Sequence, residues 1–367
     1  MNTFKDPIGT EQIEFMFSRE KSLFEQKKID KRSFLQKLKI KHLFALPSLT
    51  LKRIYRISPP FLKDIIFWAW VPHRAPASKF FARTRYAELR TLIDIKLSSL
   101  VLKSVPSKYL DSVKNTFDLG FFSTNLFDIN DLGVSILDVI DYASPTIAGA
   151  RPHFKDEQKK KIEGSFSAYY DFSRDDNQKI TSFILERIDK DFNYHLSSLA
   201  GFRCNFKDIS YSLGLVCGEN SNSEMHQDSF ASIAKGFIYL QDIGTDNSPF
   251  EYIEGSYKEA HFRSSQTNNA VLRNDTYSSG ATRLRGKELD DAITRNKLKT
   301  FTGQKGLFIL ANTAAYHRKG SHNSSKPRIT LNFEIARKGL IAKLFINFLA
   351  IIKFKFLKYK LEIWIKI

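Results

Sequence analysis

The stretch Met225-His226-Gln227-Asp228-Ser229 decides how the rest of the chain is interpreted. One residue separates His226 from Asp228, and on a β-strand residues i and i+2 point to the same face. An imidazole and a carboxylate can therefore project together from this stretch. One further imidazole would complete a set of two histidines and one carboxylate with the opposite face open, an arrangement that suits ferrous iron.

The third ligand has two candidates. His317 lies 89 residues after Asp228, and His322 follows it closely. His317 is the ligand we predict, and His322 is the alternative. A His-x-Asp triplet alone occurs by chance in many chains, so the interpretation depends on the flanking residues.

The flanking segments carry a family resemblance. They are residues 233–242 and 249–257 after the triplet, and residues 306–310, Asn323, Ser325 and 328–330 around the distal histidine. Together with the triplet they resemble the phytanoyl-CoA dioxygenase family of Fe(II)/2-oxoglutarate oxygenases, over roughly residues 205–336. The resemblance implies that His226, Asp228 and His317 bind Fe(II), and that 2-oxoglutarate and O2 take the remaining positions.

The resemblance also implies how the cofactor acid is held. In that family an arginine about eleven residues beyond the distal histidine grips the far carboxylate of 2-oxoglutarate, and Arg328 stands eleven residues after His317. Thr330 stands where a hydroxyl often helps. Gln227 resembles a position that touches the acid in some relatives. Tyr257 replaces a histidine common in relatives, but that histidine is not a metal ligand.

The implied reaction is oxidative decarboxylation of 2-oxoglutarate to succinate and CO2, coupled to hydroxylation of an unactivated C–H bond. A carboxylate at position 228, rather than a small residue that would admit halide, favours hydroxylation or desaturation over halogenation. Three alternatives stay open. They are a non-catalytic jelly-roll protein that binds a metal or ligand, a metal-dependent enzyme such as an isomerase, and a nucleic-acid demethylase; Arg328 argues against the second.

The charge of the chain suggests its substrate class. Among 367 residues, 57 Lys and Arg face 39 Asp and Glu, for a formal net charge of +18. A basic surface favours anionic partners, so we expect a small or lipid-linked anionic metabolite, although a solvated basic face is the plainer interpretation. No helix-turn-helix, zinc-finger or RNA-binding signature is present, and no specific nucleic acid is expected.

The spacing of apolar residues predicts an α+β fold. Period-two alternation predicts strands near 211–216, 236–241, 250–253, 307–310 and 329–335, and several short strands with turns favour a double-stranded β-helix of the jelly-roll or cupin kind. A helix is expected over 286–297. We divide the chain into a mainly helical region at 1–200, a catalytic core at 201–336 with a lid-like insert at 256–300, and a tail at 337–367.

The tail is both basic and apolar. It holds eight Lys or Arg and one acid, Glu362. Residues 340–352 suit a helix and 357–367 a strand, and the segment fits either an ordinary packed element or peripheral contact with an anionic membrane. Residues 34–43 predict a basic amphipathic helix. Two cysteines without metal-site spacing, and no signal pattern or membrane span, predict a cytoplasmic protein, with peripheral contact at the inner face of the membrane.

Overall fold

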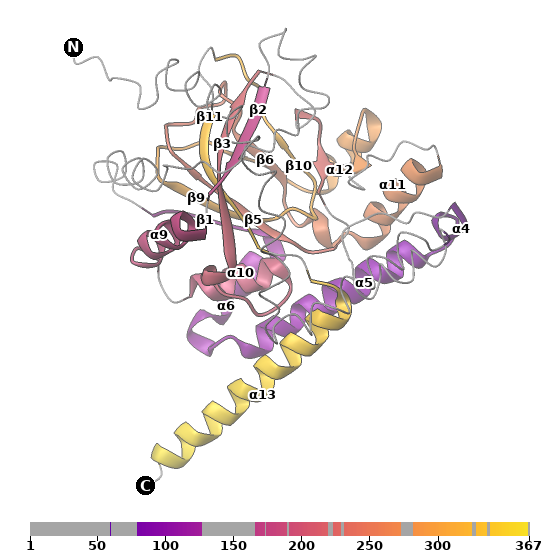
Figure 1. The fold of residues 1–367 in the computed structure, drawn as a ribbon. Coiled ribbons are helices and arrows are strands. Elements are labelled where there is room, and N and C mark those ends of the chain that lie inside the picture. The colour runs from indigo at the N-terminus through magenta and orange to yellow at the C-terminus, as the bar shows by residue number, and fades with distance from the viewer. Residues whose placement is uncertain are drawn as a thin grey trace, which may run out of the picture.

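The computed structural model describes residues 59, 79–126, 166–172, 174–188, 191–218, 223–228, 231–272, 282–324, 328–335 and 338–365. Within these ranges the chain combines helices with two antiparallel β-sheets, which confirms the expected mixture of helix and strand (Figure 1). The basic helix expected over 34–43 lies outside the described residues.

Six strands form the larger sheet, in the order β1-β9-β5-β11-β3-β2, and all neighbours are antiparallel. The four strands expected in this sheet from the sequence are confirmed. Two more strands, which the sequence did not predict, extend it at its edges. The bounds are Phe121–Asn125 (β1), Phe166–Asp171 (β2), Ile209–Cys217 (β3), Ala234–Tyr239 (β5), Leu307–Asn312 (β9) and Arg328–Ile335 (β11).

Five shorter strands form the second sheet, in the order β7-β4-β10-β6-β8. Along the chain, β3, β5, β9 and β11 of the larger sheet alternate with β4, β6 and β10 of the smaller one. This alternation brings strands that are distant in sequence side by side. The bounds are His226–Gln227 (β4), Phe250–Ile253 (β6), Thr282–Arg283 (β7), Leu298–Phe301 (β8) and His317–Lys319 (β10).

The side chains of β11 alternate between two faces of the larger sheet. One face packs into a hydrophobic core, and the other faces the smaller sheet. Its odd-numbered residues, among them Leu331 and Phe333, join a buried cluster with residues of α9 (Arg174–Leu185) and α10 (Phe192–Ala200) on the outer face of the larger sheet. Because strand residues alternate between faces, the even-numbered residues face the smaller sheet. A second cluster, which includes Tyr239 of β5 and Tyr252 of β6, fills the space between the sheets.

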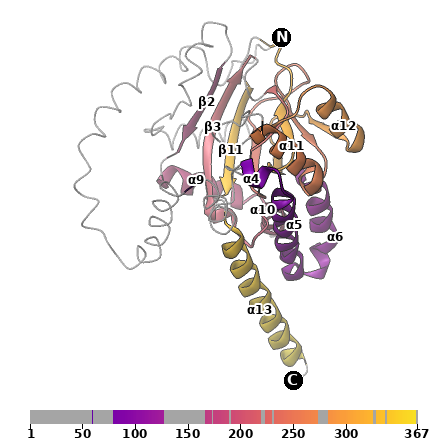
Figure 2. The same ribbon diagram turned by 90° about the vertical axis from the view of Figure 1, so that its right-hand side faces the viewer.

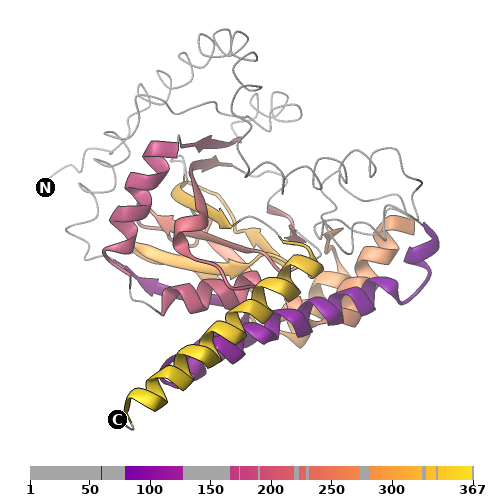
Figure 3. The same cartoon turned by 60° about the horizontal axis from the view of Figure 1, so that its bottom comes forward.

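The remaining helices lie beside the sheets or pack on one another. Helix α5 contacts α11 and α13, and Figure 3 shows α5 and α13 running beside each other. Helix α12 confirms the helix expected over 286–297. The bounds are Lys79–Ala82 (α4), Tyr86–Ser99 (α5), Leu100–Ser104 (η3), Ser107–Leu119 (α6), Phe206–Asp208 (η5), Ser256–Lys258 (η7), Ala260–Leu272 (α11), Lys287–Arg295 (α12) and Leu340–Ile365 (α13).

Residues Leu340–Ile365 of the tail form one helix of 26 residues, so the strand expected over 357–367 is wrong over 357–365. A helix that has already formed extends at little cost, because each added residue gains a hydrogen bond without a new nucleus. The leucines, lysines and glutamate of this segment are also good helix formers. In the described part of the chain, no helix combines the length and apolar character needed to cross a bilayer.

Candidate metal centre

Three side chains predicted from the sequence meet at one end of the space between the sheets. His226, Asp228 and His317 each offer a ligand atom, and these atoms lie within 4.8 Å of one another. The two imidazole rings have their centroids 4.6 Å apart. No other such group of histidine, cysteine and acidic residues occurs in the ranges that the structure describes.

The strand register explains this meeting. His226 of β4 and His317 of β10 are direct antiparallel partners, so their side chains project from adjacent strands on the same face. Asp228 follows two residues after His226, and its backbone N–H donates to the carbonyl of Thr313, 2.9 Å away. The chain is thereby turned so that the carboxylate points back toward both rings.

Backbone carbonyls orient the two imidazoles. Nδ1 of His226 lies 2.7 Å from the carbonyl oxygen of Glu224, and Nδ1 of His317 lies 2.9 Å from that of Ala315. A carbonyl only accepts, so each Nδ1 carries the proton and each Nε2 presents a lone pair. Both Nε2 atoms face Asp228. Nε2 of His226 lies 3.6 Å from its Oδ1, and Nε2 of His317 lies 3.5 Å from its Oδ2.

The electrostatics favour the forms that bind metal. Burial lowers the pKa of His226, which keeps the ring neutral, although the contact with Asp228 opposes this shift. Burial would raise the pKa of Asp228, but the charge of the Lys235 ammonium, the largest opposing cause, helps to hold the pKa of that carboxyl well below its usual range. A neutral His226 imidazole and an ionised Asp228 carboxylate are forms that bind a divalent cation accepting nitrogen and oxygen ligands.

Lys235 is a neighbour of the site that the sequence analysis did not single out. Its Nζ lies 3.0 Å from Oδ2 of Asp228 and 3.4 Å from Oε2 of Glu334. Lys235 and Glu334 are cross-strand partners on β5 and β11. The sequence signal was only a lysine in an otherwise apolar strand, and the register that pairs it with Glu334 cannot be seen without the fold.

Arg328 and Thr330 lie on the face of β11 that points toward the smaller sheet. Arg328 is buried, and its Nη1 donates to the carbonyl of Ser248, while its Nε has no hydrogen-bond partner among the described residues. Ser248 stands two residues before Phe250, whose ring packs 5.6 Å from that of His317. Thr330 donates from its hydroxyl to Asn332 at 2.8 Å.

Gln227 does not join the cluster. Its side chain is fully buried on the opposite face of β4, where it donates to Thr267 at 3.1 Å and to Thr282, and accepts from Nε of Arg263 at 3.1 Å. The structure thus places Gln227 away from the three ligands, and the cofactor contact expected for it stays a prediction. Neighbouring strand residues point to opposite faces, so a residue between two ligands cannot share their space.

His322, the alternative third ligand, is also placed apart from the cluster. Its Nδ1 lies 2.7 Å from the hydroxyl of Ser248. His195 is equally structural, because its ring stacks on Phe122 with centroids 4.1 Å apart and its Nδ1 lies 2.7 Å from the Thr116 hydroxyl. His317 is thus the second imidazole of the group.

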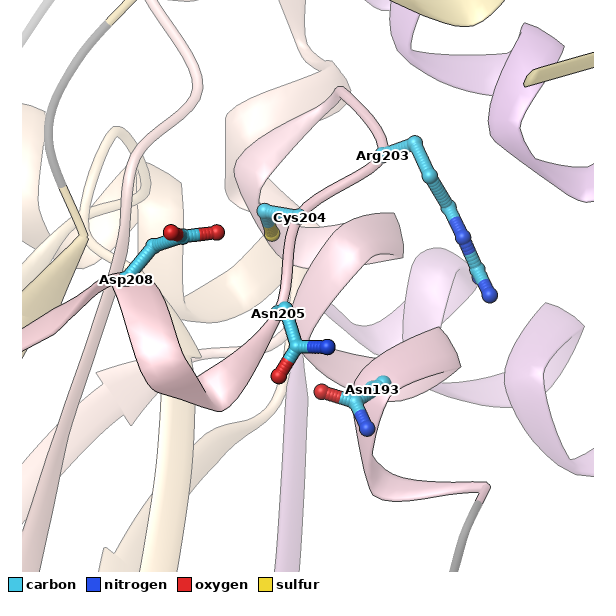
Figure 4. A pocket seen from close by; sticks show the side chains of 5 residues that line it. All are labelled: Asn193, Arg203, Cys204, Asn205 and Asp208. Atoms are coloured by element: carbon cyan, nitrogen blue, oxygen red, sulfur yellow. The ribbon is translucent and has the colours of Figure 1, made fainter. Parts of the chain in front are cut away.

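A surface hollow beside α10 is separate from this centre. Figure 4 shows its lining residues, which are Asn193, Arg203, Cys204, Asn205 and Asp208. Burial raises the pKa of the Cys204 thiol to about 12, so the group is not a thiolate nucleophile at neutral pH.

Comparison with known proteins gives weak likenesses. No family model matches the chain, and no curated protein does. Similar solved structures include the epimerase SnoN in complex with Fe3+, alpha ketoglutarate and nogalamycin RO (12% identity, 65% of this chain and 90% of that chain, TM-score 0.39). Others are EctD from S. alaskensis with 2-oxoglutarate and 5-hydroxyectoine (12%, 63% and 77%, 0.36) and a Pseudomonas putida prolyl-4-hydroxylase (7%, 62% and 97%, 0.33). Because TM-scores this low do not establish a shared fold, the function must be argued from the side chains of this chain.

Proposed function

We propose that this protein is a non-haem Fe(II)/2-oxoglutarate-dependent oxygenase. The observation that carries the proposal is the cluster of His226, Asp228 and His317, whose two free Nε2 atoms converge on one carboxylate. Two imidazoles and one carboxylate on one side of a metal leave positions for a cosubstrate and O2. The buried arginine at the start of β11 supplies the second, independent element of such a site.

The proposed fold is a double-stranded β-helix at the centre of residues 201–336. Its support is the strand order, in which β3-β11-β5-β9 of one sheet and β4-β10-β6-β8 of the other each mix early and late strands. Chain segments that cross repeatedly between two antiparallel sheets close a jelly roll. The metal ligands then lie on the smaller sheet, and Arg328 enters from the larger one.

The roles of the residues follow from their chemistry. His226, Asp228 and His317 would hold Fe(II), which together with 2-oxoglutarate and O2 supplies the oxidising power for hydroxylation, with succinate and CO2 as co-products. Arg328 offers a planar fork of donors that matches the far carboxylate of 2-oxoglutarate. Because the guanidinium is buried, it would favour an acid whose carboxylate reaches it. The Thr330 hydroxyl lies on the same face of β11, and it would donate to the acid after releasing Oδ1 of Asn332.

The proposed substrate is a small or lipid-linked anionic metabolite that is hydroxylated at an unactivated C–H bond. The support is the formal net charge of +18, which raises the local concentration of anions. The role of the protein would be to orient the carbon of the substrate that is hydroxylated and to exclude water from the site.

The proposal is tested by binding of 2-oxoglutarate to protein loaded with Mn(II), measured by calorimetry under conditions without turnover. Arg328→Lys is expected to weaken binding about tenfold or more, because one ammonium replaces a two-pronged contact. Arg187→Lys, at an exposed arginine on the far side of the sheet, is the matched control and should bind like the wild type. If the metal-loaded wild type does not bind 2-oxoglutarate, the result would instead support the alternative of a non-catalytic metal- or ligand-binding protein.

A further inference from the structure

The outer face of α13 carries six large apolar side chains that are 48–62% exposed. Each lies three or four residues from at least one other of the six, so they share a single face of the helix. Isolated exposed leucines are ordinary on protein surfaces, but a continuous stripe of this size marks a contact surface. The six are Ile341, Leu344, Phe345, Phe348, Leu349 and Ile352.

The opposite face of α13 fixes the helix to the body through polar groups. Lys343 is fully buried, and its Nζ pairs with Oδ1 of Asp94 on α5 at 2.7 Å. Asn347, which is 1% exposed, donates to the carbonyls of Leu97 and Gly201 at 3.0 and 3.1 Å. These directional contacts determine which face of the helix turns inward, so the apolar stripe is held outward.

The helix also extends beyond the body that anchors it. Figure 2 shows α13 leaving the sheets and ending at the C-terminus well away from them. At 1.5 Å per residue its 26 residues span about 39 Å. The apolar stripe occupies residues 341–352 of this helix, about 17 Å along its axis, which makes a long, flat contact rather than a pocket for a single side chain.

The charge along the helix selects the partner. Lys353 and Lys355 are exposed beside the stripe, and the same helix continues through Lys358 and Lys360 with one acid, Glu362. A second copy of the chain packed on the stripe would bring Lys353 and Lys355 of both copies to one interface, and like charges repel. An anionic lipid surface accepts both the apolar side chains and the lysines.

We propose that α13 docks on an anionic lipid surface, with its axis parallel to the bilayer. Ile341, Phe345, Phe348 and the rest of the stripe enter the boundary between headgroups and acyl chains, while Lys353 and Lys355 pair with lipid phosphates. Docking of this kind needs neither the metal nor 2-oxoglutarate. It places the enzyme at the surface where a lipid-linked anionic substrate would be found.

The experiment is flotation of the full chain with vesicles of phosphatidylcholine alone or mixed with phosphatidylglycerol. The wild type should bind the mixed vesicles at least about tenfold more strongly than the neutral ones. Phe345→Ser/Phe348→Ser and Lys353→Glu/Lys355→Glu should each reduce binding about tenfold or more. Lys114→Glu/Lys287→Glu makes the same charge change at exposed lysines of α6 and α12, and should reduce binding much less.

Urea unfolding shows whether each variant keeps the stability of the wild type, which is expected because all four altered tail residues are exposed. Equal binding to neutral and anionic vesicles, no binding at all, or an equal loss in the α6/α12 control would overturn the proposal. So would a dimer in light scattering that Phe345→Ser/Phe348→Ser abolishes, because the stripe would then belong to a second copy.

Discussion

The ion pair between Lys343 and Asp94 offers a sharp test of how the tail is attached. Their side chains are 0% and 6% exposed, and Nζ lies 2.7 Å from Oδ1. Oδ2 of Asp94 accepts from the backbone N–H of Ser232 at 2.8 Å, and Nζ also donates to the Ser232 carbonyl at 3.3 Å. The pair therefore joins α13, α5 and the segment that leads into β5.

Removing one partner leaves the other charge buried without compensation. We expect Lys343→Met to lower the free energy of unfolding by about 3–5 kcal/mol, which is roughly a hundredfold to several-thousandfold in the unfolding equilibrium. Asp94→Leu/Lys343→Met removes both charges, so its loss should be smaller. The remaining cost is the Ser232 N–H without its acceptor, about 1–3 kcal/mol.

The assay is urea unfolding followed by circular dichroism, with midpoints compared at unchanged slope. Lys353→Met, at an exposed lysine of the same helix, is the control and should change the free energy of unfolding by less than about 0.5 kcal/mol. The reasoning is refuted if Lys343→Met stays within about 1 kcal/mol of the wild type. A double variant less stable than Lys343→Met would refute it equally.

Three further predictions concern the rest of the fold. Gly236→Ala should destabilise by about 1–3 kcal/mol in urea unfolding, because its Cβ would stand 2.0 Å from the ring of Phe333. Gln227→Leu should cost about 2 kcal/mol, measured the same way, with metal stoichiometry unchanged. Burial would raise the pKa of Asp94, but the contacts with Lys343 outweigh it and lower that pKa. The Asp94 carboxylate therefore contributes to the free energy of unfolding above about pH 4, and this contribution is lost as the pH falls through the folded-state pKa. The difference in the free energy of unfolding between the wild type and Asp94→Leu/Lys343→Met should narrow in acid.

The sequence predicted the structure correctly where apolar residues repeat at a short interval along a strand. Alternation by two located the central strands, and the same rule placed His226 and Asp228 on one face, which the register with His317 confirms. That rule also excludes Gln227 from the cluster. The cofactor contact expected for Gln227 came from family resemblance alone and stays a prediction, whereas its face of the strand follows from alternation.

Contacts between residues far apart in the sequence could not be predicted from local patterns. Lys343 appears in the sequence as one more tail lysine, and its burial depends on Asp94, 249 residues earlier. The contact of Lys235 with Asp228 depends on the turn after β4, which no local period encodes. In the tail, a short alternating run favoured a strand, but continuity with the helix that begins at Leu340 decided the outcome.

The central claim is that His226, Asp228 and His317 hold Fe(II) in a form that 2-oxoglutarate can chelate. The most direct measurement is anaerobic titration of the metal-free protein with Fe(II) and then 2-oxoglutarate, followed by visible absorption. We expect a weak metal-to-ligand charge-transfer band that is lost in His226→Ala and weakened in Arg328→Ala. Folded protein with iron bound and no such band would contradict it.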